Sequence, residues 1–211
     1  MSNLPKIDTF DFPKTQFYQE EFKKEIIVLH HTASGKGPEG DYGSWTNTPE
    51  RVATSHIINR DGSCCQLYNS KYWAHHIGCT HPNNRRLNQI SIGIEIDSWG
   101  ILTWRDGKFY TYTNSVVPEK DVIEYDKSFR GGRFFERYTP EQIESTRKLL
   151  LHWNKVYGIP LDYNEDMWDL SNRAFMCTPG IWAHVSFVKA KSDVHPMPEL
   201  IAMLKNLKSQ I

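Results

Sequence analysis

Two segments that are far apart in the chain carry side chains that could hold a metal ion. The first is an apolar run at residues 26–29 that ends in His30 and His31, and the second supplies His184 and Asp193 close together. Zinc prefers imidazole, thiolate and carboxylate ligands, and a hydrolytic zinc site uses three protein ligands and leaves one position for water. His30, His184 and Asp193 would supply such a set, which is typical of a catalytic metal site.

The element that must position the first of these ligands is a buried strand. The run Ile-Ile-Val-Leu is aliphatic and β-branched, as in strands that are buried on both faces, so its end is a rigid mount. Neighbouring residues of a strand point to opposite faces, and only one of His30 and His31 can therefore reach the site. For an isolated histidine, a structural role with satisfied hydrogen bonds would be the commoner interpretation.

Five ordered segments of the sequence carry a resemblance to a known family. They are IIVLHHTA at 26–33, SHIINRDG at 55–62, WAHHIG at 73–78, SIGIEI at 91–96 and HVSFVKAKSD at 184–193. In this order they resemble the zinc-dependent N-acetylmuramoyl-L-alanine amidases of type 2, a family that includes phage endolysins, bacterial recycling amidases and animal peptidoglycan recognition proteins. The resemblance spans most of the chain and implies one Zn²⁺ ion and a peptidoglycan or muropeptide substrate.

The ligand set that the resemblance implies is His30, His184 and Asp193. The family pattern places the ligand on the first histidine of the pair, which leaves His31 for a structural or supporting role. Asp193 stands where other members carry cysteine, and a carboxylate there keeps a zinc ligand while adding a hard oxygen donor.

The resemblance also implies catalytic roles for two residues. Glu95 on the SIGIEI strand would be an ordinary exposed carboxylate if it stood alone, but the family pattern makes it the general base that takes a proton from water. Lys191 shares the loop of Asp193 and could stabilise the oxyanion of a tetrahedral intermediate, with Lys189 as the alternative. Some phage members carry tyrosine where this chain has Ser55, so more of the catalysis is expected to fall to Glu95.

Five further residues are candidates for contact with the substrate. His56 and His76 match histidines around the family's cleft, although a buried structural histidine is nearly as common an outcome. Trp73, Arg85 and Asn88 lie between two of the motifs and could line the groove, with packing in the core as the alternative for Trp73.

Length and net charge indicate how many domains the chain forms and which binding partners its charge does not favour. The 211 residues suit one domain, and 25 basic and 25 acidic side chains cancel, so the sequence indicates neither nucleic-acid binding nor attraction to an anionic membrane. No apolar stretch is long enough to span a bilayer, and the first residues lack the apolar region of a secretory signal. We therefore expect a monomer made in the cytoplasm without a signal peptide, and the four cysteines do not suggest a disulfide framework.

The order of expected elements predicts an α/β fold, a single domain over 1–211 with a mixed central β-sheet flanked by helices. Turn and capping signals set the expected boundaries. The expected elements are an irregular lead-in at 1–20, a glycine-rich loop from residue 35 that leads into a short helix after Thr48, a hairpin at 55–67, an inserted β-hairpin and loop at 99–138, a helix from Thr139 to about Gly158, and a C-terminal helix at 197–211.

The insertion at 99–138 is rich in aromatic residues, namely Trp99, Trp104, Phe109, Tyr110 and Tyr112. Exposed aromatic rings can stack on the faces of sugars, but alternating aromatic residues in a hairpin more often pack the hairpin onto its domain. We favour packing.

The resemblance implies hydrolysis of the amide bond between N-acetylmuramic acid and L-alanine in peptidoglycan. The insertion favours a phage-type endolysin, which acts on the cell wall after release, over a cytoplasmic recycling amidase. A peptidoglycan-binding or regulatory protein without catalysis is the alternative of another class, and cleavage within the stem peptide is a third possibility.

Overall fold

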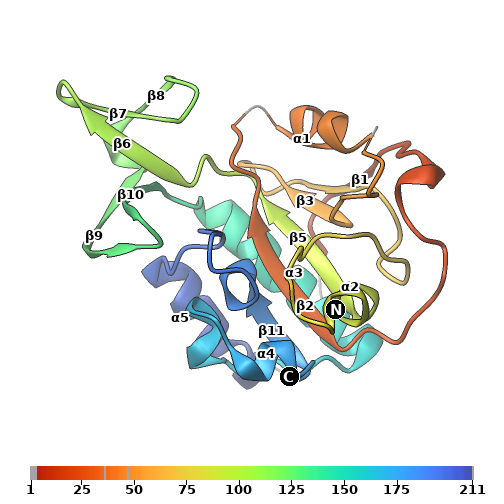
Figure 1. Cartoon of the computed structure of the whole chain (residues 1–211). Coiled ribbons are helices and arrows are strands. Elements are labelled where there is room, and N and C mark those ends of the chain that lie inside the picture. The colour runs from red at the N-terminus through yellow and green to blue at the C-terminus, as the bar shows by residue number, and fades with distance from the viewer. Residues whose placement is uncertain (1–3, 36, 47, 211) are drawn as a thin grey trace.

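The computed structural model describes residues 4–35, 37–46 and 48–210. Its centre is a six-stranded mixed sheet in the order β1-β4-β3-β5-β2-β11 (Figure 1). All neighbours in this sheet pair in parallel except β3 and β4, which form the predicted hairpin. The strands are β1 (Ile7–Thr9), β2 (Ile26–His31), β3 (His56–Ile58), β4 (Cys64–Gln66), β5 (Ser91–Ile96) and β11 (Gly180–Ala183).

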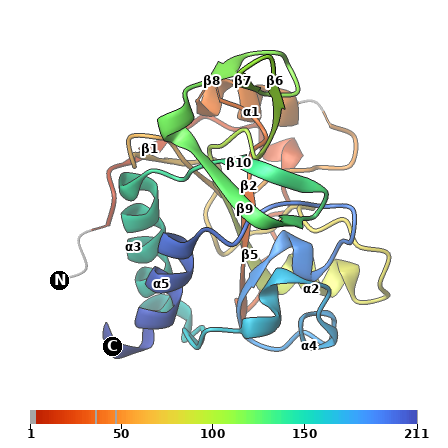
Figure 2. The same cartoon turned by 90° about the vertical axis from the view of Figure 1, so that its left-hand side faces the viewer.

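Strands β2 and β5 form the middle of the core, and every one of their residues is buried. Helices α3 (Pro140–Tyr157) and α5 (Pro198–Asn206) lie on one side of them, and α2 (Asn84–Ile90) and α4 (Asn172–Phe175) lie on the other (Figure 2). Apolar side chains from α2, α3 and α5 join the strands in one cluster. The predicted α/β architecture with helices on both faces is confirmed.

Helix α3 begins and ends where the sequence predicts. The Thr139 hydroxyl accepts from the Gln142 backbone N–H while the Gln142 side chain accepts from the Thr139 N–H, which is a capping box. Gly158 ends the helix with φ of 72°, a left-handed conformation that costs glycine little. The C-terminal helix is also present as α5, and no helix among the described residues is long and apolar enough to cross a membrane.

The prediction of a helix after Thr48 is wrong. A helix forms earlier instead, as α1 (Pro38–Trp45), in the glycine-rich stretch that was expected to be a loop. Pro38 occupies the first helical turn, where its fixed φ is favourable and its missing N–H costs nothing. After Thr48 the chain makes a single turn, Arg51 adopts φ of 54°, and Val52 then pairs with His75, so no helix can continue.

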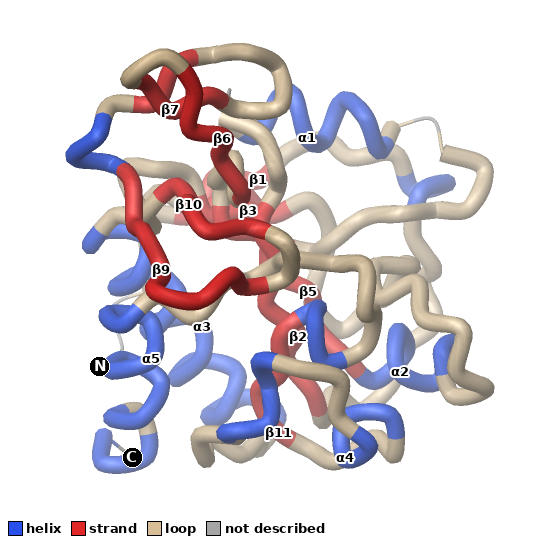
Figure 3. Tube along the Cα trace, turned by 60° about the vertical axis from the view of Figure 1, so that its left-hand side comes forward, coloured by secondary structure: helices blue, strands red, loops and turns tan. Residues whose placement is uncertain are grey.

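The insertion at 99–138 forms a complete second sheet. The expected hairpin is present as β6 (Ile101–Arg105) and β7 (Lys108–Tyr110), but the expected loop consists of strands β8 (Val116–Val117), β9 (Val122–Phe129) and β10 (Gly132–Glu136). They form an antiparallel sheet in the order β8-β7-β6-β10-β9, which stands beyond the end of β5 (Figures 1 and 3). No residue of β9 is fully buried and β8 contains a single buried residue, so these strands lack the apolar runs by which buried strands are recognised.

The lead-in at 1–20 contains one regular strand, β1, which pairs with β4 at the edge of the main sheet. Its remaining described residues are largely irregular, and Phe12 and Phe17 are buried against β3 and β4 in a small second apolar cluster. The lead-in therefore packs across the domain. All four cysteines are free thiols.

A buried ionic cluster joins the two sheets. Arg60, in the turn between β3 and β4, donates through both terminal nitrogens to the carboxylate of Glu136 on β10, and its Nε lies 3.5 Å from Asp97. Glu136 also accepts from the backbone N–H of Trp99 at 2.6 Å. Both carboxylates are buried, and among the described residues only Arg60 forms ion pairs with them, so the contact between the two sheets depends on this guanidinium.

Replacing Arg60 with methionine is expected to lower the free energy of unfolding at pH 7 by about 3 kcal/mol, since two buried carboxylates lose their counter-charge. Burial already raises the pKa of Asp97 to about 6, and removal of Arg60 raises it further. An acid whose pKa is raised by folding binds its proton more tightly in the folded state, so stability is regained as the pH falls. Urea unfolding at pH 7 and pH 5 should therefore show a smaller loss at pH 5.

The double variant Arg60→Met/Glu136→Gln is the control, because it removes a charge together with its partner. It should be more stable at pH 7 than Arg60→Met alone. An equal loss for Arg60→Met at both pH values would contradict an electrostatic role for Arg60.

Candidate metal centre and cleft

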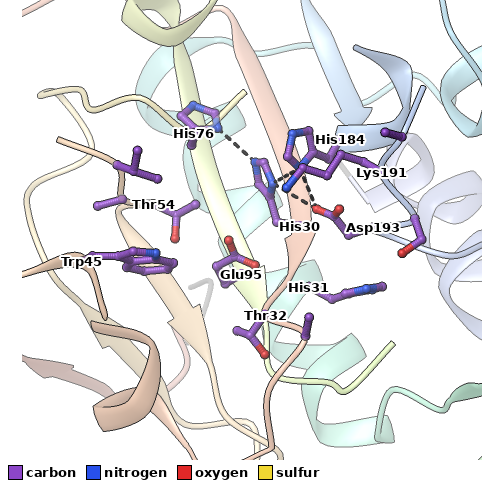
Figure 4. Close-up of a pocket in the computed structure, with 15 residues that line it drawn as sticks. His30, His31, Thr32, Trp45, Thr54, His76, Glu95, His184, Lys191 and Asp193 are labelled. Atoms are coloured by element: carbon purple, nitrogen blue, oxygen red, sulfur yellow. Dashed lines mark hydrogen bonds and ion pairs between the residues drawn. The ribbon is translucent and has the colours of Figure 1, made fainter. Parts of the chain in front are cut away.

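Three ligand atoms meet at the end of the main sheet, as the sequence predicts. His30 lies near the end of β2, His184 follows β11 in a short 3₁₀ turn, and Asp193 lies on the loop nine residues further on (Figure 4). The Nδ1 atoms of the two histidines are 2.9 Å apart, and Asp193 Oδ2 lies 3.2 Å from His30 Nδ1 and 2.8 Å from His184 Nδ1. All three residues are buried, and this geometry is consistent with a metal ion.

The hydrogen bonds around these residues determine which ring nitrogens are available. His184 Nε2 lies 2.7 Å from the carbonyl oxygen of Ile77, which can only accept, so in the neutral ring the proton is on Nε2 and Nδ1 is bare. His30 Nε2 lies 3.0 Å from His76 Nδ1, and His76 Nε2 lies 2.8 Å from the Ser91 hydroxyl. When His30 Nε2 donates its proton to His76 Nδ1, His30 Nδ1 carries no proton either.

In that arrangement two imidazole lone pairs and a carboxylate oxygen point at one another without a proton between them, which only a cation satisfies. Burial, together with His184, lowers the pKa of His30 to about 4, so His30 is neutral near pH 7, as a ligand must be. The second ring nitrogens of both histidines are held by protein groups, which is the usual way of orienting metal-binding imidazoles. The donor set therefore fits a divalent ion such as zinc.

Glu95 lies on β5 directly opposite His30 on β2. Its carboxyl group is buried, and Oε2 has no hydrogen-bond partner among the described residues. Burial is the main reason why the pKa of Glu95 is raised well above its usual range, and the carboxylate of Asp193 raises it further. An unpartnered carboxyl group beside a metal site is a group that can accept a proton from water.

A cleft of about 320 Å³ contains these groups. Lys191 lines it as well, from an exposed position on the loop that carries Asp193, whereas Lys189 is not among the lining residues (Figure 4). The remaining wall comes from β2, from the segment before β3 and from α1. The lining residues are His30, His31, Thr32, Ala33, Trp45, Val52, Ala53, Thr54, His76, Glu95, His184, Ala190, Lys191, Ser192 and Asp193.

Of the five residues that were candidates for substrate contact, only His76 lines this cleft. His56 is buried, with Nδ1 2.8 Å from the Ser55 hydroxyl and its ring 5.0 Å from that of Trp153. Its side chain therefore packs from β3 against α3.

Trp73, Arg85 and Asn88 also lie outside the cleft. Trp73 stacks on Tyr18 at 3.9 Å, and Arg85 lies over its ring at 5.2 Å. Asn88 is fully buried and accepts hydrogen bonds from the backbone N–H groups of His76 and Ile77. In this structure Trp73 and Asn88 support the segment that carries His76 and are not exposed to a ligand.

His31 points away from the ligand group, although it forms part of the cleft wall. Its Nδ1 lies 3.1 Å from the Tyr138 hydroxyl, and Gly100 packs so closely that a Cβ there would lie 2.4 Å from His31 Nε2. The same hydroxyl accepts from the backbone N–H of His195. Tyr138 therefore connects the end of β2 to the loop after Asp193.

Sequence reasoning missed Trp45 and Thr54, which form the wall opposite the metal ligands (Figure 4). Trp45 lies on α1, where a loop was expected. Thr54 directly precedes the SHIINRDG segment, and a Cβ on Gly93 would lie 2.8 Å from its methyl group and 3.1 Å from the His76 ring. That glycine in the middle of a buried strand was a signal of close approach.

The second sheet braces the loop that carries His184 and Lys191. Arg130, in the turn between β9 and β10, donates to the carbonyl oxygens of Val185 at 3.1 Å and Lys189 at 3.2 Å. Within the loop, the backbone N–H of Val185 donates to the carbonyl of Asp193 at 3.0 Å. The insertion thus contributes directly to the position of two of the three ligands.

Solved structures that share this fold include PlyL and an endolysin amidase. PlyL is 13% identical to this chain, with a TM-score of 0.55, and the match covers 96% of each chain. The endolysin N-acetylmuramoyl-L-alanine amidase LysCS from Clostridium intestinale is 13% identical, with a TM-score of 0.52 and coverage of 100% of this chain and 97% of its own.

A third structure is AmiD from E. coli, an N-acetylmuramyl-L-alanine amidase in complex with the substrate anhydro-N-acetylmuramic acid-L-Ala-D-γ-Glu-L-Lys. It is 17% identical, with a TM-score of 0.54, and the match covers 88% of this chain and 59% of AmiD. At these identities the three structures show that the fold is shared.

The family itself is shown by the sequence. No curated protein sequence matches the chain. The model of the Amidase_2 family, described as N-acetylmuramoyl-L-alanine amidase, matches residues 21–196, which is most of the chain and includes all three ligand residues. The protein therefore belongs to the N-acetylmuramoyl-L-alanine amidase family and has a complete His-His-Asp metal site.

Proposed function

We propose that the protein uses one zinc ion to hydrolyse the amide bond between N-acetylmuramic acid and the L-alanine of the stem peptide in peptidoglycan. The observation that carries this proposal is the meeting of three ligand atoms and an unpartnered carboxyl group in one cleft. The family and the substrate complex of AmiD support the choice of substrate.

Residues of the chain have separate roles in this proposal. Zinc at such a site supplies Lewis acidity and makes water more acidic. Glu95 takes the proton of the attacking water and returns it to the departing amine, which a raised pKa favours. Lys191 stabilises the negative charge that develops on the carbonyl oxygen. His76 holds the orientation of His30 through the 3.0 Å contact.

We further propose that the protein is a phage-type endolysin that acts as a monomer on the polymeric wall after release from the cytoplasm. The three metal ligands and Glu95 all belong to one chain, so the proposed chemistry needs no residue from a second copy. The second sheet extends the protein surface beside the cleft, and an extended surface suits a polymeric substrate. A recycling amidase, which would act on soluble muropeptides, is the alternative.

Digestion of purified sacculi with zinc-loaded protein, followed by mass spectrometry, tests the reaction. We expect free stem peptides that begin with L-alanine, and Glu95→Gln should slow their release about 10²–10⁴-fold because the general base is lost. Glu119→Gln, an exposed carboxylate in the short 3₁₀ helix between β8 and β9, is the matched control and should retain full activity.

Other products would assign other functions. Fragments in which muramic acid is still joined to alanine would indicate cleavage within the stem peptide. Faster turnover of soluble muropeptides than of sacculi would favour the recycling role, and binding of sacculi without any cleavage would favour a non-catalytic protein.

Zinc removal is expected to destabilise the folded protein, because an ion that binds only the folded state stabilises it by about 4 kcal/mol at a thousand times its dissociation constant. Calorimetry after chelation should show a lower melting temperature and recovery with one equivalent of Zn²⁺. In Asp193→Asn the recovery should require much more zinc, whereas Asp126→Asn, on the exposed second sheet, should respond as the unaltered protein. Full recovery of Asp193→Asn at one equivalent would remove Asp193 from the ligand set.

A further inference from the structure

A second hollow lies beside the catalytic cleft, between α1 and the second sheet. Its volume is about 350 Å³, near the lower end of the range for small-molecule sites. Thr32 and Ala33, which directly follow β2, line both the cleft and this hollow, so the two are adjacent along one wall. The opposite wall carries Trp99 and Tyr112 from the insertion, and Asp41 on α1 contributes a carboxyl group.

The two aromatic residues of this hollow differ in exposure: Trp99 is fixed by packing, and Tyr112 is open to solvent. Trp99 lies so close to the chain after β2 that a Cβ on Gly35 would be 2.1 Å from its Nε1, and its backbone N–H donates to Glu136. The Tyr112 ring is 5.8 Å from that of Trp99 at 71°, yet Tyr112 is 71% exposed. Packing, which the sequence favoured, accounts for the buried Phe109 but leaves Tyr112 open to a ligand.

Asp41 supplies a hydrogen-bond acceptor to the same hollow as these two aromatic residues. It is only 7% exposed, and its Oδ2 accepts no hydrogen bond from the part of the chain that the structure describes. A buried oxygen without a donor is costly unless a ligand supplies one. Ser44 and Thr113 add hydroxyl groups to the same hollow.

We propose that this hollow binds an N-acetylhexosamine unit of the glycan strand, next to the muramoyl residue whose amide bond is cleaved. Sugar rings present C–H groups that pack on aromatic faces and hydroxyl groups that donate to carboxylates, and the hollow offers both kinds of partner. The inference rests on the proposed function for the identity of the glycan. On this proposal, the insertion at 99–138 is the part of the protein that binds the glycan strand.

A stem-peptide amine is the competing ligand, because an ammonium group could pair with Asp41. Burial raises the pKa of Asp41 to about 7, so its carboxyl group carries only part of its charge at neutral pH, which suits a hydroxyl donor better than a cation. An open aromatic ring beside it also favours a sugar face over an extended peptide.

Titration calorimetry with chitotetraose, a β-1,4-linked N-acetylglucosamine tetramer, tests the inference on the zinc-loaded protein. Tyr112→Ala should weaken binding about three- to tenfold, the scale of one aromatic contact. Asp41→Asn keeps the shape of the side chain but replaces one acceptor oxygen with an amide nitrogen that only donates, and it should weaken binding roughly tenfold, since the hydrogen bond from the sugar hydroxyl to that oxygen is lost. Trp104→Ala removes an exposed aromatic residue of the same sheet that does not line the hollow, and should bind as the unaltered protein.

Thermal unfolding of each variant checks that it is folded before the comparison is made. Failure of the unaltered protein to bind chitotetraose, or an equal loss in Trp104→Ala, would overturn the inference. So would Asp41-dependent binding of a free L-Ala-D-γ-Glu-L-Lys peptide without binding of the tetrasaccharide. Because chitotetraose contains no amide bond of the muramoyl type, its binding is independent of whether the protein cleaves peptidoglycan.

Discussion

Parallel pairing of three neighbouring strands is the constraint on which the rest of the structure depends. Strand β2 lies between β5 and β11, and the register places His30 opposite Glu95 and Leu29 opposite Ala183, the residue before His184. Carboxyl ends of parallel strands meet at one edge of a sheet, which is where α/β proteins place their ligands. Two ligands and the proposed base therefore come together from positions 30, 95 and 184.

The rigidity of that edge comes from burial on both faces of the strands. The central strands have no exposed residue, and helices α2, α3 and α5 cover them from two sides. A one-residue slip of β2 would turn His30 away from the site and bring His31 in, and it would exchange the side chains that pack against the helices on the two faces of the sheet. The hydrophobic core thus selects which histidine can serve as a ligand.

The second sheet is tied into this edge at two places. Arg60 and Glu136 connect it to the β3–β4 turn, and Arg130 connects it to the loop between His184 and Asp193. An insertion that only covered the surface would not need buried charge at its base. These contacts make the sheet a support for the metal site as well as a wall beside the cleft.

The sequence by itself determined the elements whose signals are local. Apolar strands β2 and β5, the capped helix α3, the β3–β4 hairpin and the residues of the ligand set all follow from side-chain types within short segments, and five ordered motifs identified the family. Only the tertiary structure decided what depends on distant partners. It placed α1 before Thr48, folded a polar stretch into β8, β9 and β10, and buried Trp73 and Asn88 behind the cleft instead of in it. Pairing across a sheet and burial against another segment are long-range interactions, which no local pattern of residues records.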